Sequence, residues 1–116
     1  MNYKGFVDIQ VNGFMGIDFS MPGLSIDDVV NVTLSLAKLG TIAYCPTVVT
    51  SSMEVYRDNL KIIAEAAKLP EISGHILGIH LEGPFISPTP GASGAHQAKY
   101  IIPPSIDDFK LMQEYA

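Results

Sequence analysis

Polar side chains in two separate parts of this sequence have the spacing needed to share one reactive site. Asp8, Gln10 and Asn12 alternate with β-forming apolar residues, and residues two apart in a strand point the same way. His80 and Glu82 have the same spacing at the end of a second apolar run. If the two strands are neighbours, both sets point into one interior. Asp8 and His80 could equally serve only as hydrogen-bonding groups of a core.

Glu82 has the strongest need for a partner among these residues. A buried glutamate without a cation is costly, so pairing, protonation or a metal ion must compensate it. Gly83 and Pro84 follow directly, and a proline cannot donate to a following ladder. We therefore predict Glu82 at the carboxyl end of a parallel strand, the end at which α/β sheets and barrels bind ligands and metals.

Local spacing does not assemble a complete metal site. His75, His80 and His96 are scattered and lack a ligand pattern such as His-Glu-x-x-His. The sequence also lacks the usual signals of phosphoryl transfer, serine hydrolysis and hydride transfer. From the residues alone, the prediction is a piece of a metal-dependent α/β enzyme.

The elements expected to position these residues alternate between strand and helix. Three β-forming runs are predicted strands: 5–12, 41–49 and 75–82. Their starts recur at about 35 residues, the rhythm of successive βα units in a parallel sheet. Each helix is predicted to begin at a serine with an acid three residues later, as in a capping box: Ser25, Ser51 and Ser105. In the last helix, Ile106, Phe109 and Met112 are expected to face inward.

About three βα units are too few for a closed barrel of eight, which takes about 250 residues. We interpret residues 1–116 as α/β, the incomplete first part of a (β/α)8 TIM-type barrel. A complete three-stranded domain is the alternative, but its edges would expose apolar strand. In an isolated barrel fragment, inner-face groups such as Val48 and Ile79 would lack the opposite barrel wall, so we expect a homo-oligomer.

Composition and charge exclude several partner classes. The net charge is −5 without a basic run, which argues against nucleic acid and an anionic membrane surface. The single Cys45 rules out an internal disulfide and is expected to be a reduced core thiol. No apolar run has the length of a membrane span and no signal peptide is recognisable, so a cytoplasmic protein is expected.

Three motifs occur together in one known family, in the same order. They are Gly5–Gly13 with Gly16–Phe19, Pro46–Thr47 with Thr50–Ser52, and Gly78–Phe85 leading to Gly94–His96. In this combination the chain closely resembles the N-acetylglucosamine-6-phosphate deacetylase family of the amidohydrolase superfamily. The Leu-Glu-Gly-Pro-Phe and Gly-Ala-His pair is specific to that family, whereas the opening Gly-Phe-Val-Asp-Ile is shared widely among amidohydrolases.

The resemblance implies a metal-dependent hydrolase on a (β/α)8 barrel that converts N-acetylglucosamine 6-phosphate to glucosamine 6-phosphate and acetate. It makes Glu82 the metal glutamate and places Ala95 and His96 against the amino-sugar phosphate. Many superfamily members carry His-x-His in the first strand for a second metal. Gln10 and Asn12 stand at those positions here, which favours one divalent ion, zinc or iron.

The resemblance also indicates which parts of the family lie outside this chain. The family's two histidine ligands, its catalytic aspartate and its phosphate-binding arginine come later in the barrel, and part of its small β-domain comes earlier. No catalytic residue is therefore expected within residues 1–116. The leading hypothesis is a fragment of an enzyme of amino-sugar metabolism that is inactive alone. The alternative is a non-catalytic truncated domain that binds sugar phosphate or self-associates.

Overall fold

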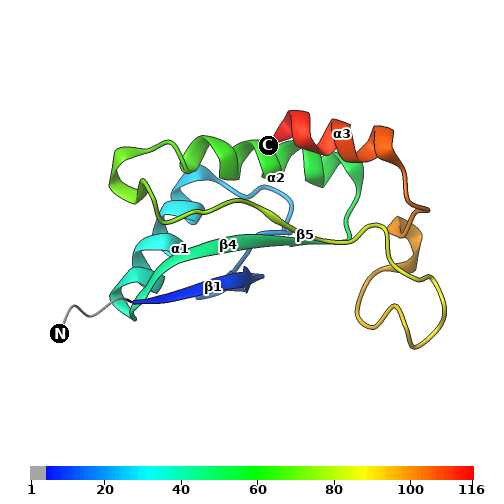
Figure 1. Ribbon diagram of the computed structural model, residues 1–116, viewed down its shortest axis with the longest axis horizontal. Helices are drawn as coiled ribbons and strands as arrows, with labels where there is room; N and C mark the ends of the chain where they lie inside the picture. The colour runs from blue at the N-terminus through cyan, green and yellow to red at the C-terminus, as the bar shows by residue number, and fades with distance from the viewer. Residues whose placement is uncertain (1–4) are drawn as a thin grey trace.

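The centre of the molecule is a three-stranded parallel sheet. The structure, a computed structural model, describes residues 5–116. The strands β1 (Phe6–Val11), β4 (Thr41–Val49) and β5 (His80–Glu82) have the order β1-β4-β5 (Figure 1). Both pairings are parallel, so the predicted α/β class with a parallel sheet is confirmed. Three strands do not close a barrel within the residues that the structure describes.

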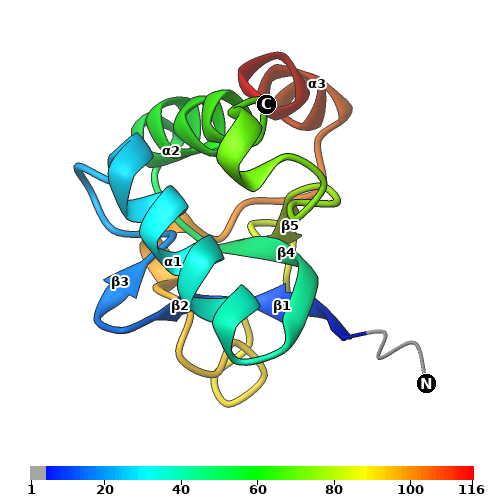
Figure 2. The same ribbon diagram turned by 90° about the vertical axis from the view of Figure 1, so that its left-hand side faces the viewer.

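Two helices lie on the same side of this sheet, α1 (Ile26–Lys38) and α2 (Met53–Ala66) (Figure 2). The predicted cap of α1 is confirmed, because the Asp28 backbone N–H donates to Ser25 Oγ and the Ser25 N–H donates to the Asp28 carboxylate. The predicted cap of α2 is one residue too early. Ser52 caps the helix, whereas the Ser51 hydroxyl donates to the carbonyl of Val49 at the end of β4.

The last helix, α3 (Ile106–Tyr115), begins after Ser105 as predicted. Its expected inward face is wrong for two of three residues. Met112 is buried, but Ile106 is 73% and Phe109 44% exposed. The reason is that α3 packs mainly along α2 (Figure 1), so only a narrow part of its surface is covered.

The third strand is shorter than predicted. A short 3-10 helix, η1 (Pro70–Ile72), precedes it, and the strand itself begins only at His80. Ile76 makes an isolated bridge to Tyr44 on β4, and the regular ladder resumes where Thr47 pairs with His80. The chain therefore follows β4 as an extended segment before it forms β5.

The connection between β1 and α1 contains a small hairpin. Its strands are β2 (Gly13–Phe14) and β3 (Ile17–Asp18), paired antiparallel. The turn uses positive φ angles at Met15 and Gly16. The segment after β5 is a long irregular loop with one turn of 3-10 helix, η2 (Ala98–Tyr100).

The core lies between the helices and the facing side of β4. Its largest fully buried side chains include Tyr44, Val48, Tyr56, Leu60 and Ile63. Val48 was expected on the open side of the sheet, and this is wrong, because strand alternation puts it with Tyr44 on the helix side. Cys45 is a free, half-buried thiol. No helix within residues 5–116 has the length and apolar character needed to cross a membrane.

Candidate functional site

Three predicted polar residues meet at the carboxyl end of the sheet. Glu82 is the last residue of β5, Gln10 lies in β1, and Asn12 follows β1 directly. Gln10 Nε2 donates to Glu82 Oε2 over 2.9 Å, and Asn12 Nδ2 donates to the same oxygen over 3.0 Å. Because β4 lies between β1 and β5, the two amides reach across the central strand to one carboxylate.

These contacts hold Glu82 in its charged form. The hydrogen bond from Asn12 is the largest cause that lowers the Glu82 pKa below 4.5, and His96, Gln10 and His80 lower it further against the opposing effect of burial. The Glu82 side chain is 34% exposed, so the expectation of a buried carboxylate is only partly correct. Two amide donors and access to water keep this carboxylate ionised.

Asp8 and His80 do not join this cluster. Asp8 Oδ1 accepts a hydrogen bond from the backbone N–H of Gln10, and His80 Nδ1 lies 3.2 Å from Thr47 Oγ1. The sequence left open whether these two residues belong to the reactive site or only form hydrogen bonds. In the structure each forms a hydrogen bond outside the Glu82 cluster.

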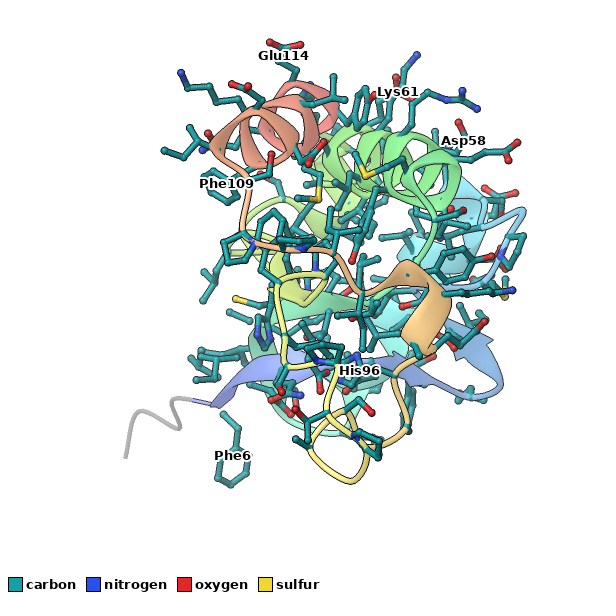
Figure 3. All side chains as sticks on the ribbon, turned by 90° about the vertical axis from the view of Figure 1, so that its right-hand side faces the viewer. Phe6, Asp58, Lys61, His96, Phe109 and Glu114 are labelled. Carbon is teal, nitrogen blue, oxygen red and sulfur yellow. The ribbon has the colours of Figure 1, made fainter. Side chains whose placement is uncertain are left out.

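His96 reaches the site from the long loop after β5. Its Nδ1 lies 2.9 Å from Thr50 Oγ1, and its Nε2 lies 3.5 Å from Glu82 Oε1. Its side chain is only 17% exposed. Figure 3 shows His96 between this loop and the end of the sheet, whereas Phe6 projects away from the ribbon. The loop therefore brings a histidine from far along the chain to the carboxylate.

The cluster lines a cleft of about 260 Å³. Its lining residues are Gln10, Asn12, Val49, Thr50, Glu82, Ala95, His96 and Gln97. Gln10, Asn12, Glu82, Ala95 and His96 are among them, whereas the other candidates from the sequence, Asp8, His75 and His80, are not. Thr50 was noticed only as part of a motif, and its position directly after β4 was the signal that could have placed it here. An apolar groove of about 510 Å³, lined by α2, α3 and the segment 76–81, is larger but is lined by no Asp, Glu or His side chain.

Glu82 fits as one ligand of a divalent cation but not as a whole site. An ionised carboxylate has several lone pairs, and the two amide hydrogen bonds go to one oxygen, leaving Oε1 toward His96. A protein metal site commonly takes three or four ligands. Within residues 5–116, no three His, Cys, Asp or Glu side chains gather in a group that could hold a metal ion. The described part of the chain therefore offers one carboxylate, that of Glu82, and no complete set of ligands.

Comparison with known proteins gives a consistent set of relatives. The chain is 38% identical over 107 residues to N-acetylglucosamine-6-phosphate deacetylase of Bos taurus and 42% identical over 98 residues to that of Rattus norvegicus. It covers 25% and 23% of those proteins, so it spans about a quarter of their length. No family model matches the chain.

Solved structures agree with the sequence relatives. The crystal structure of N-acetylglucosamine-6-phosphate deacetylase from Pasteurella multocida superposes on 97% of this chain with a TM-score of 0.82 and 29% identity. The chain covers 28% of that structure. The resemblance predicted from the motifs is therefore confirmed in sequence and in fold.

Proposed function

We propose that this chain forms the Glu82 side of the active site of a metal-dependent deacetylase that acts on N-acetylglucosamine 6-phosphate. Its products are glucosamine 6-phosphate and acetate. The three parallel strands and their helices correspond, in this proposal, to the first βα units of a (β/α)8 barrel. The activity belongs to the assembled barrel, because the described residues supply one metal ligand.

One observation carries the proposal. The cleft joins Glu82 of the Leu-Glu-Gly-Pro-Phe motif to His96 of the Gly-Ala-His motif, with 3.5 Å between Glu82 Oε1 and His96 Nε2. These are the two motifs most specific to the family. Their convergence at the carboxyl end of the sheet is what a shared active site requires.

Glu82 is proposed to hold a single divalent ion, zinc or iron. When bound, such an ion supplies Lewis-acid chemistry, polarising a carbonyl oxygen or lowering the pKa of water. Gln10 and Asn12 orient the carboxylate by donating to one of its oxygens. Because amide groups are poor ligands for a transition metal, the first strand supplies hydrogen bonds and not a second metal site.

Ala95 and His96 are proposed to contact the amino-sugar phosphate. Both line the cleft, and the His96 ring already has one nitrogen engaged by Thr50. The other nitrogen, Nε2, is directed to the side of the cleft occupied by the Glu82 carboxylate. A ligand in the cleft can therefore be positioned by an imidazole and a carboxylate together.

A chimera tests this function. Residues 5–116 would replace the matching quarter of the Pasteurella multocida deacetylase, and acetate release from N-acetylglucosamine 6-phosphate would be measured. We expect turnover, and we expect His96→Ala to raise KM. Thr33→Val, at a buried residue that does not line the cleft, is the matched control and should leave KM unchanged. A chimera that melts cooperatively but releases no acetate would contradict the proposed function.

A further inference from the structure

Asn59 is a polar residue on the buried side of α2. It is 1% exposed, and the other buried residues on this side of the helix, Tyr56, Leu60 and Ile63, recur at helical spacing. A buried amide without hydrogen-bond partners is costly. The position of Asn59 in the core therefore depends on the partners that its side chain finds.

These partners are two backbone carbonyls in segment 19–21, which follows β3 directly (Figure 2). Asn59 Nδ2 donates to the carbonyl of Phe19 over 2.8 Å and to that of Met21 over 2.9 Å. Carbonyl oxygens only accept and an amide nitrogen carries two hydrogens, so one side chain satisfies both groups. Because Phe19 is fully buried, its carbonyl depends on this donor.

Segment 19–21 also contacts two residues of the cleft. The Phe19 N–H donates to the backbone carbonyl of Asn12 over 3.0 Å, and Asn12 is one of the two amides that orient the carboxylate. The Val49 N–H donates to Ser20 Oγ over 2.9 Å, and Val49 lines the cleft at the end of β4. The segment therefore links the end of β1 to the end of β4.

The other N–H groups of segment 19–21 stabilise its own turn. Ser20 N–H donates to Asp18 Oδ1, and Met21 N–H donates to the Asp18 carbonyl. Among the residues that the structure describes, Asn59 makes the only hydrogen bonds between α2 and this segment. Asn59 is therefore what fixes the turn, as a unit, to the helix.

We infer that Asn59 is a positioning residue for the cleft, although it does not line the cleft itself. By fixing segment 19–21 to α2, it holds Asn12 where its side chain donates to Glu82, and it holds Val49 in the cleft wall. The inference rests on the proposed function only for the reaction that takes place in the cleft. The positioning follows from contacts within this chain.

NMR spectra (¹H–¹⁵N) of the folded 116-residue chain test which groups Asn59 holds. In Asn59→Ala, the Val49 N–H and the Asn12 side-chain amide should move to the chemical shifts of groups without a hydrogen bond, although Asn59 contacts neither. Leu60→Ala is the matched control, because it truncates the next buried residue of α2 and removes no hydrogen bond. It should lower stability but leave both signals in place.

Ser20 provides a milder second test, because its side chain lies in a half-buried residue. Ser20→Ala removes the acceptor of the Val49 N–H and should shift that signal while the Asn12 amide keeps its own. Ser20→Thr retains a hydroxyl and should keep the Val49 signal near its wild-type position. Equal spectra of Ser20→Ala and wild type would contradict the link from the segment to β4.

A double-variant cycle in the chimera tests whether Asn59 acts through Asn12. Asn59→Ala and Asn12→Ala should each lower kcat/KM, by up to about 100-fold, as a misplacement of about 1 Å can do. The double variant should lose no more than the larger single loss, because both changes release the same contact. Leu60→Ala should leave kcat/KM unchanged, and additive losses of Asn59→Ala and Asn12→Ala would contradict action through Asn12.

Two NMR results would also overturn the inference. One is a wild-type Asn59 whose side-chain NH₂ signals are those of a free amide, and this measurement requires no variant to fold. The other is an Asn59→Ala variant that loses stability but keeps the Val49 and Asn12 signals in place, which would limit Asn59 to core packing. Because neither readout needs turnover, a failure here is separate from a failure of deacetylation in the chimera.

Discussion

Gln10 Nε2 donates to Glu82 Oε2 over 2.9 Å although β4 separates their strands. The contact, with the parallel one from Asn12, links the two outer strands of the sheet through one carboxylate. A carboxylate that accepts two amide N–H groups is stabilised in its ionised form. The site is therefore set up to present a fixed negative charge at the carboxyl end of the sheet.

Removal of the amides should raise the pKa of Glu82. Asn12 is the largest cause of its lowered pKa and Gln10 a smaller one, so Asn12→Ala is expected to raise it more than Gln10→Ala. Carbon-detected NMR titration of the glutamate carboxyl groups measures the effect. Asn31→Ala, on the exposed side of α1, is the control. Equal Glu82 titrations in all three variants would contradict the assignment.

The same shift predicts how stability depends on pH. The folded-state pKa of Glu82 lies below its ordinary value of 4.5, so the unfolded chain binds the proton more readily. The stabilisation is present above the pKa of the unfolded chain and is lost as the pH falls through the folded-state value. In urea unfolding, Asn12→Ala should flatten this acidic limb, and an unchanged slope would argue against it.

Gly83→Ala should destabilise the chain by about 1–3 kcal/mol. The added Cβ would meet Thr50 Oγ1 and the backbone would keep a positive φ, and strain of this kind has about that magnitude. Gly78→Ala is the matched control, because open space surrounds Gly78, and its effect should stay within about 0.5 kcal/mol. Equal losses in the two variants, measured by urea unfolding, would show that Gly83 needs no special space.

Sequence periodicity predicted the part of this site that lies on regular strands. Alternation predicted that Gln10 and Glu82 would point into one interior, and the bounds of β4 agree with the predicted 41–49. Periodicity cannot predict the path of an irregular loop, such as the one that carries His96. The hydrogen bond between His96 and Thr50 joins a loop to a strand end 46 residues away, and it depends on the loop path and not on any repeat.

The other differences have similar physical causes. Ser51 and Ser52 are chemically alike, and the backbone direction at the end of β4 decides which one caps α2. Exposure of Phe109 depends on how much of α3 is covered by α2, which amphipathic spacing alone does not determine. Which serine caps α2 and how far Phe109 is buried both depend on the tertiary arrangement of the elements.

Ionisation of two buried tyrosines should lower the free energy of unfolding at high pH. Burial raises the pKa of Tyr44 and of Tyr56 from 10.0 to about 12. A raised folded-state pKa means that the stabilisation is present below the pKa of the unfolded chain and is lost as the pH rises from about 10 to about 12. Tyr44→Phe should make this alkaline loss shallower in urea unfolding. A Tyr44 that ionises near pH 10 in the folded chain, by tyrosinate absorbance, would contradict the prediction.

The edge strand β1 should promote self-association. Phe6 is 68%, Val7 54% and Ile9 73% exposed, and apolar edge strands with unpaired backbone groups tend to pair with other chains. Light scattering coupled to size exclusion is expected to show an oligomer, which Ile9→Lys should weaken. Leu34→Lys on α1, 37% exposed, is the control. A wild-type monomer at high concentration would refute this expectation.

The metal content of the chimera, counted by mass spectrometry alongside acetate release, tests the central claim most directly. The account predicts one divalent ion per chain in the chimera and in the control Glu71→Gln, which changes an exposed acid of η1. Glu82→Gln should lose both the ion and the turnover. Gln10→Ala should still bind one ion per chain, but with an affinity about 10- to 100-fold lower, as is usual when a group that orients a metal ligand is removed. Two ions per chain, or full metal content and acetate release in Glu82→Gln, would contradict the account.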